Sequence, residues 1–269
     1  MVTLPNIGMV KAESAYIYIN ADGSVEGTDK IQRDDNVYTL TDNIDRRLIM
    51  VLKDDIVIDG AGYALRGGLP SGIQLAYRDN VTIKNFIISL ENFTGVCIWV
   101  YYCSNCAILN NTMESDYSCS GIDVGGGDSN FIAGNHVMNM AGAIGLGEGT
   151  SDNVIFGNTL TNNSQSIGIV NSQNNTIYRN NFINNNYIHI MTQLGSTSFV
   201  NYLDNGTVGN YWSDYNGTDD DGDGIGDIPH VIDENIQDNY PLMNPVDITG
   251  IPEFPSWVIL ALFLVVLCL

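Results

Sequence analysis

Residues 174–186 read NNTIYRNNFINNN, and seven of these thirteen positions are asparagine. Such a stretch is either a disordered polar tract or one turn of a structure that needs asparagine at fixed places. Self-similarity decides between the two, because the pattern N-x4-N recurs along the chain at spacings of 25, 25, 23 and 22 residues. It begins at Asn80, Asn105, Asn130, Asn153 and Asn175, and DIVIDG (55–60) occupies the same slot one repeat earlier.

A second marker shares this period, because an apolar-x-apolar triplet accompanies each repeat. The triplets are Ile73/Leu75, Val96/Ile98, Ile122/Val124, Ile144/Leu146, Ile167/Ile169 and Ile188/Ile190. Short period-2 apolar stretches separated by glycine, asparagine, serine and aspartate are typical of strands and turns rather than of helical repeats. A coil of 22 to 25 residues with about three short strands predicts an all-β protein, a right-handed single-stranded parallel β-helix.

The asparagines then have a structural role at the turns. Side-chain amides at equivalent turns can hydrogen-bond from coil to coil and satisfy groups that a tight inward turn would leave unpaired. The stretch at 174–186 is therefore one coil. In segments such as NVIFGN the apolar residue occupies the second slot, the third slot or both, so the inward phase stays open by one residue. A slip of one residue exchanges the two faces of a strand.

The ends of a solenoid require caps, because an open end exposes core and unpaired strand edges. Tyr211, Trp212 and Tyr215 are suited to close the C-terminal end. We expect a signal-peptide remnant or linker (1–15), an N-terminal cap and irregular coil (16–54), β-helix repeats (55–205), a C-terminal cap with an Asp-rich loop (206–245), a linker (246–256) and part of a membrane anchor in a short hydrophobic helix (257–269).

Two motifs carry resemblances to known families. The asparagine-rich coils, GNYWSDY (209–215), the Asp-Gly loop and NYPLM (239–243) resemble NosD-like right-handed parallel β-helix proteins of the archaeal surface type, over about residues 55–245. NosD itself is a periplasmic, copper-related accessory protein for nitrous oxide reductase, and the resemblance implies architecture more firmly than that role. IPEFPSW (251–257) and the apolar run after it resemble a truncated PEF-type C-terminal sorting signal, which implies an extracellular, surface-anchored protein.

Charge and cysteine content restrict the partners. The formal net charge is −21, and Arg179 is the only basic residue after Lys84, so the chain lacks the cationic surface that nucleic acid requires. Four of the five cysteines are Cys97, Cys103, Cys106 and Cys119. One CxxC without a second pair makes zinc an unexpected ligand. A disulfide or two is expected in an exported protein, and three pairings of four cysteines stay open.

The strongest local motif is DDDGDGIGD (219–227). Oxygen ligands at alternating positions, with Gly224 at the sharp turn, suit a hard cation such as calcium. We expect the ligands to be the carboxylates of Asp219, Asp221, Asp223 and Asp227 and the carbonyl of Ile225. His230 stands where an EF-hand has glutamate, and the loop instead resembles those of thrombospondin type 3 repeats. The calcium would be structural, and the alternative is a solvated acidic loop.

One strand face carries candidate binding residues. If Val96, Ile98 and Val100 point inward, then Cys97, Trp99 and Tyr101 point outward. The aromatic rings, next to small residues of the neighbouring coils, would form a platform for a sugar ring, with hydroxyls bonded by neighbouring polar groups. The glycan-binding candidates are Gln74, Trp99, Tyr101 and Asp123. The alternative is that a loop covers the aromatic side chains.

Catalysis and copper binding are weaker hypotheses. Lyases of acidic polysaccharides need cations, and the coils offer only Arg66, Arg78, Lys84 and Arg179. A neutral-glycan hydrolase needs paired carboxylates, for which Asp123 and Glu148 are one coil apart. Copper would need soft ligands. His136, Met138 and Met140 are expected to alternate along one strand face, as copper(I) would require, with Met113 one coil away.

The sequence therefore favours a non-catalytic, surface-anchored β-helix that binds glycans or cell-envelope proteins. It would contact the membrane through its C-terminal segment and carry a calcium loop. The alternatives are a polysaccharide hydrolase or lyase on the same scaffold and, third, a copper-related accessory protein.

Overall fold

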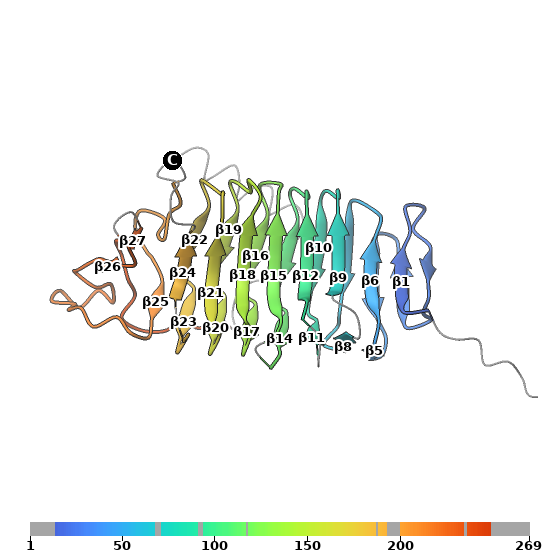
Figure 1. Cartoon of the computed structure of the whole chain (residues 1–269), viewed down its shortest axis with the longest axis horizontal. Coiled ribbons are helices and arrows are strands. Elements are labelled where there is room, and N and C mark those ends of the chain that lie inside the picture. Colours follow the sequence, from blue (N-terminus) through green and yellow to red (C-terminus); the bar gives the residue numbers. More distant parts are fainter. Residues whose placement is uncertain are drawn as a thin grey trace, which may run out of the picture.

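The computed structural model describes residues 14–67, 71–90, 94–116, 118–186, 188–192, 200–233 and 236–248. Within these residues the chain is all-β and winds into a parallel solenoid of about six turns, drawn as a rod in Figure 1. The predicted fold class is confirmed. The described residues contain no helix long and apolar enough to span a membrane. The hydrophobic segment at 257–269 lies outside the described residues.

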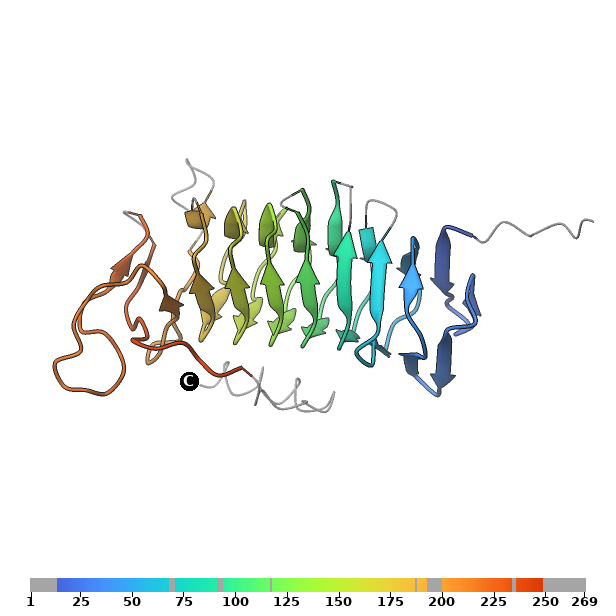
Figure 2. The same cartoon turned by 90° about the horizontal axis from the view of Figure 1, so that it is seen from below.

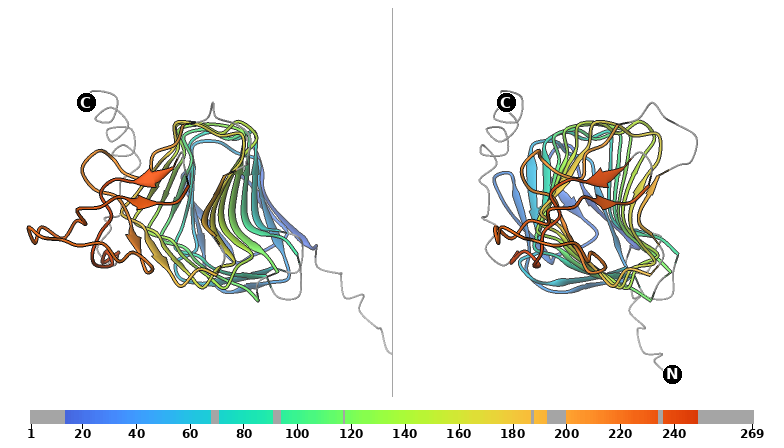
Figure 3. Two further views of the ribbon diagram at one scale, coloured as in Figure 1. Left: turned by 60° about the vertical axis from the view of Figure 1, so that its left-hand side comes forward. Right: turned by 90° about the vertical axis from the view of Figure 1, so that its left-hand side faces the viewer.

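Three sheets form the sides of the solenoid, and each coil contributes one strand to sheet A, then one to sheet B, then one to sheet C (Figure 3). Sheet A contains β1 (Tyr16–Ile19), β2 (Val25–Glu26), β6 (Leu48–Val51), β9 (Ser71–Ala76), β12 (Val96–Tyr101), β15 (Ser120–Gly125), β18 (Gly142–Gly147), β21 (Gln165–Ile169) and β24 (Ile188–Thr192). Sheet B contains β3 (Ile31–Asp34), β4 (Val37–Leu40), β7 (Ile56–Asp59), β10 (Val81–Lys84), β13 (Ala107–Leu109), β16 (Phe131–Ala133), β19 (Val154–Phe156) and β22 (Thr176–Tyr178). Sheet C contains β5 (Ile44–Asp45), β8 (Ala64–Gly67), β11 (Ile87–Leu90), β14 (Thr112–Glu114), β17 (His136–Met138), β20 (Thr159–Thr161), β23 (Asn181–Ile183) and β25 (Tyr211–Trp212).

The core is built from columns of identical position in successive coils. In sheet A one inward column consists entirely of isoleucine, in register from strand to strand and almost fully buried: Ile17, Ile49, Ile73, Ile98, Ile122, Ile144, Ile167 and Ile190. β-Branched side chains pack well on the pleated surface of a strand. Stacking of like residues therefore gives a continuous apolar interior along the rod.

Buried asparagines form ladders at the corners. The longest ladder runs through Asn111, Asn135, Asn158, Asn180 and Asn210, all at most 1% exposed. Each of the first four donates its backbone N–H and its Nδ2–H to Oδ1 of the next, over 2.9 to 3.0 Å. The ladder thus satisfies polar groups that face the core, as the sequence predicts.

The ladder ends at the buried carboxylate of Asp238. Backbone N–H of Asn210 donates to its Oδ2 over 2.7 Å, and Nε1 of Trp212 donates to the same oxygen over 2.8 Å. A carboxylate only accepts hydrogen bonds, so it suits the donor end of a chain of amides. Burial of Asp238 raises its pKa to about 6.

The N-x4-N marker is out of register by one residue in the first two coils. Asn80 and Asn105 lie at exposed turns with φ of +55°, whereas Asn130 is buried in a ladder. Strand register places Cys106, not Asn105, opposite Asn130, because Ala107 pairs with Phe131. This difference resolves the open inward phase. The position of Asn130 is filled by the apolar residues Val81 and Cys106 in the two preceding coils and by asparagine in the later ones.

The triplet marker also needs a correction. The triplets that start at Val96 and Ile188 begin two residues before the inward positions of the other coils, because Val96 pairs with Ser71 and Ile188 with Gln165. In β12, Ile98 and Val100 are the inward residues that match Ile73 and Leu75 of the neighbouring strand β9.

Both ends of the described rod are covered (Figures 1 and 2). At the N-terminal end, β1 pairs with β2 and β3 with β4 in antiparallel fashion. At the other end, the ring of Trp212 stacks on Phe182 at 4.2 Å between centroids, and Trp212 is 1% exposed. An antiparallel pair, β26 (His230–Val231) and β27 (Gln237–Asp238), lies beyond it.

Replacement of one ladder asparagine tests this role. Asn135→Ala removes four side-chain hydrogen bonds and leaves the Asn111 amide and the Ile108 carbonyl without those partners. We expect the free energy of unfolding, measured by urea denaturation, to fall by about 3 kcal/mol, since buried unsatisfied groups cost roughly 1–3 kcal/mol each.

Asn162→Gly is the matched control. Asn162 is exposed, has φ of +55°, and glycine adopts that conformation without strain. A loss of the same size in both variants would contradict a special role for the buried ladder.

Candidate functional site

A groove of about 300 Å³ lies on the outward face of sheet A, across β12, β15, β18 and β21. Its lining combines two aromatic side chains, several glycines and three polar side chains. The lining residues are Trp99, Tyr101, Asp123, Val124, Gly125, Gly145, Leu146, Gly147, Glu148, Gln165, Gly168 and Val170.

Glycine makes the face hollow. Gly145 pairs with Asp123 on one side and with Gly168 on the other, and Gly147 pairs with Gly125. These positions face outward, where any other residue would project a side chain into the groove. Runs of glycine at outward positions of neighbouring strands therefore form its floor.

The aromatic wall belongs to β12. Trp99 and Tyr101 are half-buried neighbours whose ring centroids lie 5.5 Å apart. The ring of Tyr101 leans over the next coil, because one of its carbons is 3.3 Å from the place where a Cβ on Gly125 would be. At the adjacent corner the rings of Tyr77 and Tyr102 stack at 5.5 Å and extend the aromatic surface, with 65% and 46% of these residues exposed.

Asp123 is the most unusual polar group in the groove. Its Oδ1 lies 2.5 Å from the position that a Cβ on Gly145 would take, so the carboxyl group rests on the floor. Burial raises the pKa of Asp123 to about 6, and no hydrogen bond or cation within the described residues offsets it. A partly buried carboxyl group without a protein partner can hydrogen-bond a ligand without first breaking an internal contact.

Two further polar side chains face the same space. Glu148 is exposed, and burial together with the nearby Glu148 carboxylate raises the pKa of the Tyr101 phenol to about 12. Gln165 of β21 lies across the floor, with its Nε2 2.5 Å from where a Cβ on Gly168 would be. The sequence alone does not indicate Gln165 as a site residue. The one local sign is Gly168, three residues later, which leaves room for the Gln165 side chain.

Three of the four glycan-binding candidates line the groove. These are Trp99, Tyr101 and Asp123. Gln74 pairs with Trp99 on the side away from Asp123 and is not part of the lining. It remains a neighbour of the aromatic wall.

The expected outward position of Cys97 is wrong. Cys97 is fully buried, and so is the next residue, Ile98, so inward and outward side chains do not alternate at this point of the strand. Backbones approach closely here: a Cβ on Gly72 would lie 2.7 Å from the Cys97 carbonyl oxygen. Small side chains are therefore required in this column.

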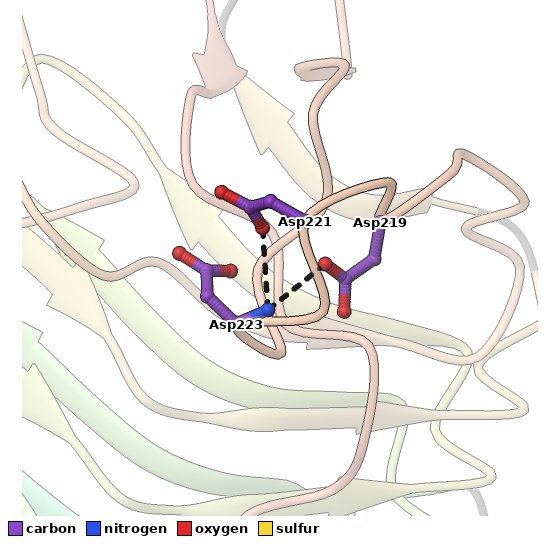
Figure 4. A group of neighbouring side chains, drawn as sticks. All are labelled: Asp219, Asp221 and Asp223. Atoms are coloured by element: carbon purple, nitrogen blue, oxygen red, sulfur yellow. Dashed lines mark hydrogen bonds between the residues drawn. The ribbon is translucent and has the colours of Figure 1, made fainter.

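The Asp-rich loop brings three of its predicted ligands together. Carboxylate oxygens of Asp219, Asp221 and Asp223 all lie within 4.8 Å of one another (Figure 4). Asp219 also organises the turn, since its carboxylate accepts the N–H groups of Gly222 and Gly224 over 2.8 and 3.0 Å. Gly224 has φ of +88°, which explains glycine there.

The carboxylate of Asp227 is not in this group, which consists of side chains alone and so does not bear on the Ile225 carbonyl. Asp227 accepts the N–H of Asp220 over 2.7 Å, and the N–H of Ile225 donates to Asp223 over 2.8 Å. They stay predicted ligands that would have to complete the coordination of a hard cation, which takes six to eight oxygens.

The four residues considered for copper do not converge. Met113 and Met140 are fully buried in the hydrophobic core. His136 and Met138 flank the inward Val137 and lie half-buried on the outer face of sheet C. Side chains inside the core and on the outer face of the sheet cannot share a metal ion, so these four residues together do not form a copper site.

Comparison with known proteins identifies one family. A family model described as periplasmic copper-binding protein (NosD) matches residues 8–217. A search of curated proteins found no match.

The raised pKa of Asp123 predicts a pH-dependent stability. A carboxyl group with its pKa raised from 3.8 to about 6 contributes stability fully below pH 3.8 and loses it as pH rises through 6. We expect the unfolding free energy of the wild type, relative to Asp123→Asn, to fall by about 2 kcal/mol between pH 4 and pH 7. A difference between the two proteins that does not change with pH, in urea titrations, would contradict the assignment.

Proposed function

The chain belongs to the NosD family, and we propose that it is a non-catalytic β-solenoid of the cell envelope that binds a neutral glycan in the groove of sheet A. The description of the family as periplasmic fits an extracellular or envelope location. Anchoring at the cell surface through the C-terminal segment, beside other envelope proteins, is part of the proposal.

One observation carries it. Two aromatic side chains of one coil and three polar side chains line a groove of about 300 Å³, whose glycine floor carries the Asp123 carboxyl group and the Gln165 amide. Aromatic rings offer flat apolar surface to the C–H face of a sugar, while carboxylate and amide groups hydrogen-bond its hydroxyls. Concave sites with apolar walls and few well-placed polar groups are typical of ligand binding.

Charge favours a neutral saccharide over an acidic one. The lining contains Asp123 and Glu148 but neither lysine nor arginine. A uronic acid or sulfated sugar would bring a negative charge beside these carboxyl groups and would be repelled. Neutral hydroxyls, in contrast, are good donors to both carboxyl groups.

A carbohydrate hydrolase is the second candidate. Its supporting observation is that Asp123, with a pKa of about 6, is partly protonated near neutral pH and shares the groove with Glu148. A pair of carboxyl groups in one groove is the requirement for acid and base roles in glycoside hydrolysis. Binding ranks first because the aromatic side chains and the polar groups of the lining account for binding by themselves, whereas hydrolysis also requires the two carboxyl groups to flank the scissile bond.

We further propose that the Asp-rich loop binds calcium in a structural role. The cluster of Asp219, Asp221 and Asp223 supports this proposal, since three carboxylates within 4.8 Å repel one another without a cation. The loop is part of the described C-terminal region, whose chain also supplies Asp238 to the asparagine ladder. Calcium would thus stabilise the end of the rod.

Loss of the aromatic wall tests glycan binding. We expect the purified protein to retain at least one oligosaccharide from an immobilised panel of neutral gluco-, galacto- and manno-configured chains. Trp99→Ala should weaken that binding at least tenfold, measured by titration calorimetry, because the stacking surface is lost. Uronic-acid chains of matched length should not be retained.

Tyr63→Ala is the control, because Tyr63 is an aromatic residue 37% exposed and remote from the groove lining. Absence of binding to every neutral chain, or equal losses in both variants, would contradict the proposal. Release of new reducing ends from a retained chain would favour the hydrolase instead.

Calcium addition should raise stability at the C-terminal cap. At a calcium concentration 100 times Kd the unfolding free energy should rise by about 2.7 kcal/mol. Asp221→Asn should abolish most of this gain, whereas Asp29→Asn, at an exposed site in the N-terminal part, should retain it. An equal calcium-dependent rise of the unfolding free energy in both variants would contradict calcium binding at the Asp-rich loop.

A further inference from the structure

We propose that Cys103 and Cys106 form a thiol–disulfide site that closes the corner between β12 and β13 by reaction with a disulfide of the glutathione class. This inference does not depend on glycan binding. It starts from the position of the two thiols, which lie three residues apart on either side of a tight turn.

The corner forces both thiols inward. Tyr102 and Asn105 adopt φ of +48° and +55°, so the backbone turns sharply before each cysteine. Cys103 is 0% and Cys106 2% exposed. Cys106 occupies the column in which the next coil has the ladder residue Asn130, and its N–H donates to Oδ1 of that asparagine over 2.9 Å. Its backbone therefore has a structural partner, while its thiol takes no part in the ladder.

The two thiols contact each other and share one backbone neighbour. Their side chains hydrogen-bond with one another. The N–H of Arg78 donates to Sγ of Cys103 over 3.3 Å, and Sγ of Cys106 donates to the Arg78 carbonyl over 3.8 Å. Sγ of Cys103 also donates to the Tyr101 carbonyl over 3.3 Å, and Sγ of Cys106 also donates to the Ser104 carbonyl over 3.5 Å. Both thiols therefore donate to backbone carbonyls, but Sγ of Cys103 also accepts a backbone N–H, which stabilises its thiolate and assigns it the nucleophilic role.

The acidities agree with this geometry. Donation from Cys106 lowers the pKa of Cys103 to about 7, and the pKa of Cys106 is raised by the same contact and by burial. A thiol with a pKa near ambient pH is a favourable attacking group in disulfide exchange.

The other two described cysteines differ. Cys97 is fully buried in the small-residue column, and burial raises its pKa. Cys119 donates to the Leu90 carbonyl over 3.6 Å and lies in the core. Neither lies in a CxxC turn, so we assign the exchange chemistry to the corner pair.

The reaction balances as two exchange steps. The Cys103 thiolate attacks oxidised glutathione, forming a Cys103–glutathione disulfide and releasing one glutathione thiolate. Cys106 loses its proton and attacks Sγ of Cys103, which forms the Cys103–Cys106 bond and releases the second glutathione. Overall, two protein thiols are oxidised and one external disulfide is reduced to two thiols.

The corner adjoins the groove. Tyr101 and Tyr102 directly precede Cys103, and the carbonyl oxygen of Cys103 is 2.1 Å from where a Cβ on Gly127 would be. A bond across this corner would fix the backbone that carries the aromatic wall. Because both thiols are buried, exchange requires local opening of the corner, and a low urea concentration should accelerate it.

The experiment is oxidation of the reduced, full-length protein with oxidised glutathione, followed by acid quenching, alkylation in denaturant and peptide mass spectrometry. We expect the peptide with Cys103 and Cys106 to lack two hydrogens and to resist alkylation at least tenfold more than Cys97 and Cys119. Equal alkylation of all four cysteines would overturn the proposal, and so would a Cys97–Cys119 bond formed in place of the corner bond.

Two variants sharpen the test. Cys106→Ser should trap glutathione on Cys103, because the resolving thiol is absent, whereas Cys119→Ser should leave closure of the corner unchanged. Absence of the trapped adduct in folded Cys106→Ser would overturn the proposed order of attack. If that variant does not fold, the peptide mass spectrometry of the oxidised wild-type protein tests the proposal by itself.

Discussion

The coil-to-coil asparagine ladder is the interaction on which the rest of the structure depends. A chain that turns sharply inward at every corner exposes polar groups to an apolar interior, where an unpaired group is costly. The ladder solves this problem with one residue type, because each amide accepts from the preceding coil and donates to the next. It therefore fixes the register of successive coils, and it is completed by the carboxylate of Asp238.

A fixed register converts single residues into surface features. Outward positions of neighbouring strands become rows, so an aromatic residue in one coil, a carboxyl group in the next and glycine beyond it form a groove. Trp99, Asp123 and Gly145 are one such row. We therefore propose that the outward residues, which differ from coil to coil, determine function, whereas the inward residues are similar in successive coils and maintain the fold.

The repeat and the fold class could be predicted from sequence, because apolar periodicity and asparagine spacing are local signals. The sequence could not, however, show which residue of each repeat faces the core. In LNNT, either Asn110 or Asn111 fits a ladder, and only strand pairing shows that Asn111 is buried while Asn110 turns with φ of +54°. Trp99, Tyr101 and Asp123 were found because alternation holds from Ile98 onward in β12 and from Ile122 onward in β15. Cys97 was placed on the wrong face because two successive residues, Cys97 and Ile98, are buried there. Gln165 was missed because a groove depends on several coils.

Hydrogen exchange of the asparagine side-chain amides tests the central claim most directly. In the folded protein, the Nδ2 protons of Asn135, Asn158 and Asn180 should exchange about as slowly as backbone amides of the core strands, because each donates within the buried ladder. The exposed Asn162 gives the reference rate. Ladder protons that exchange as fast as those of Asn162 would contradict the account, since the coils would then be held in register by something else.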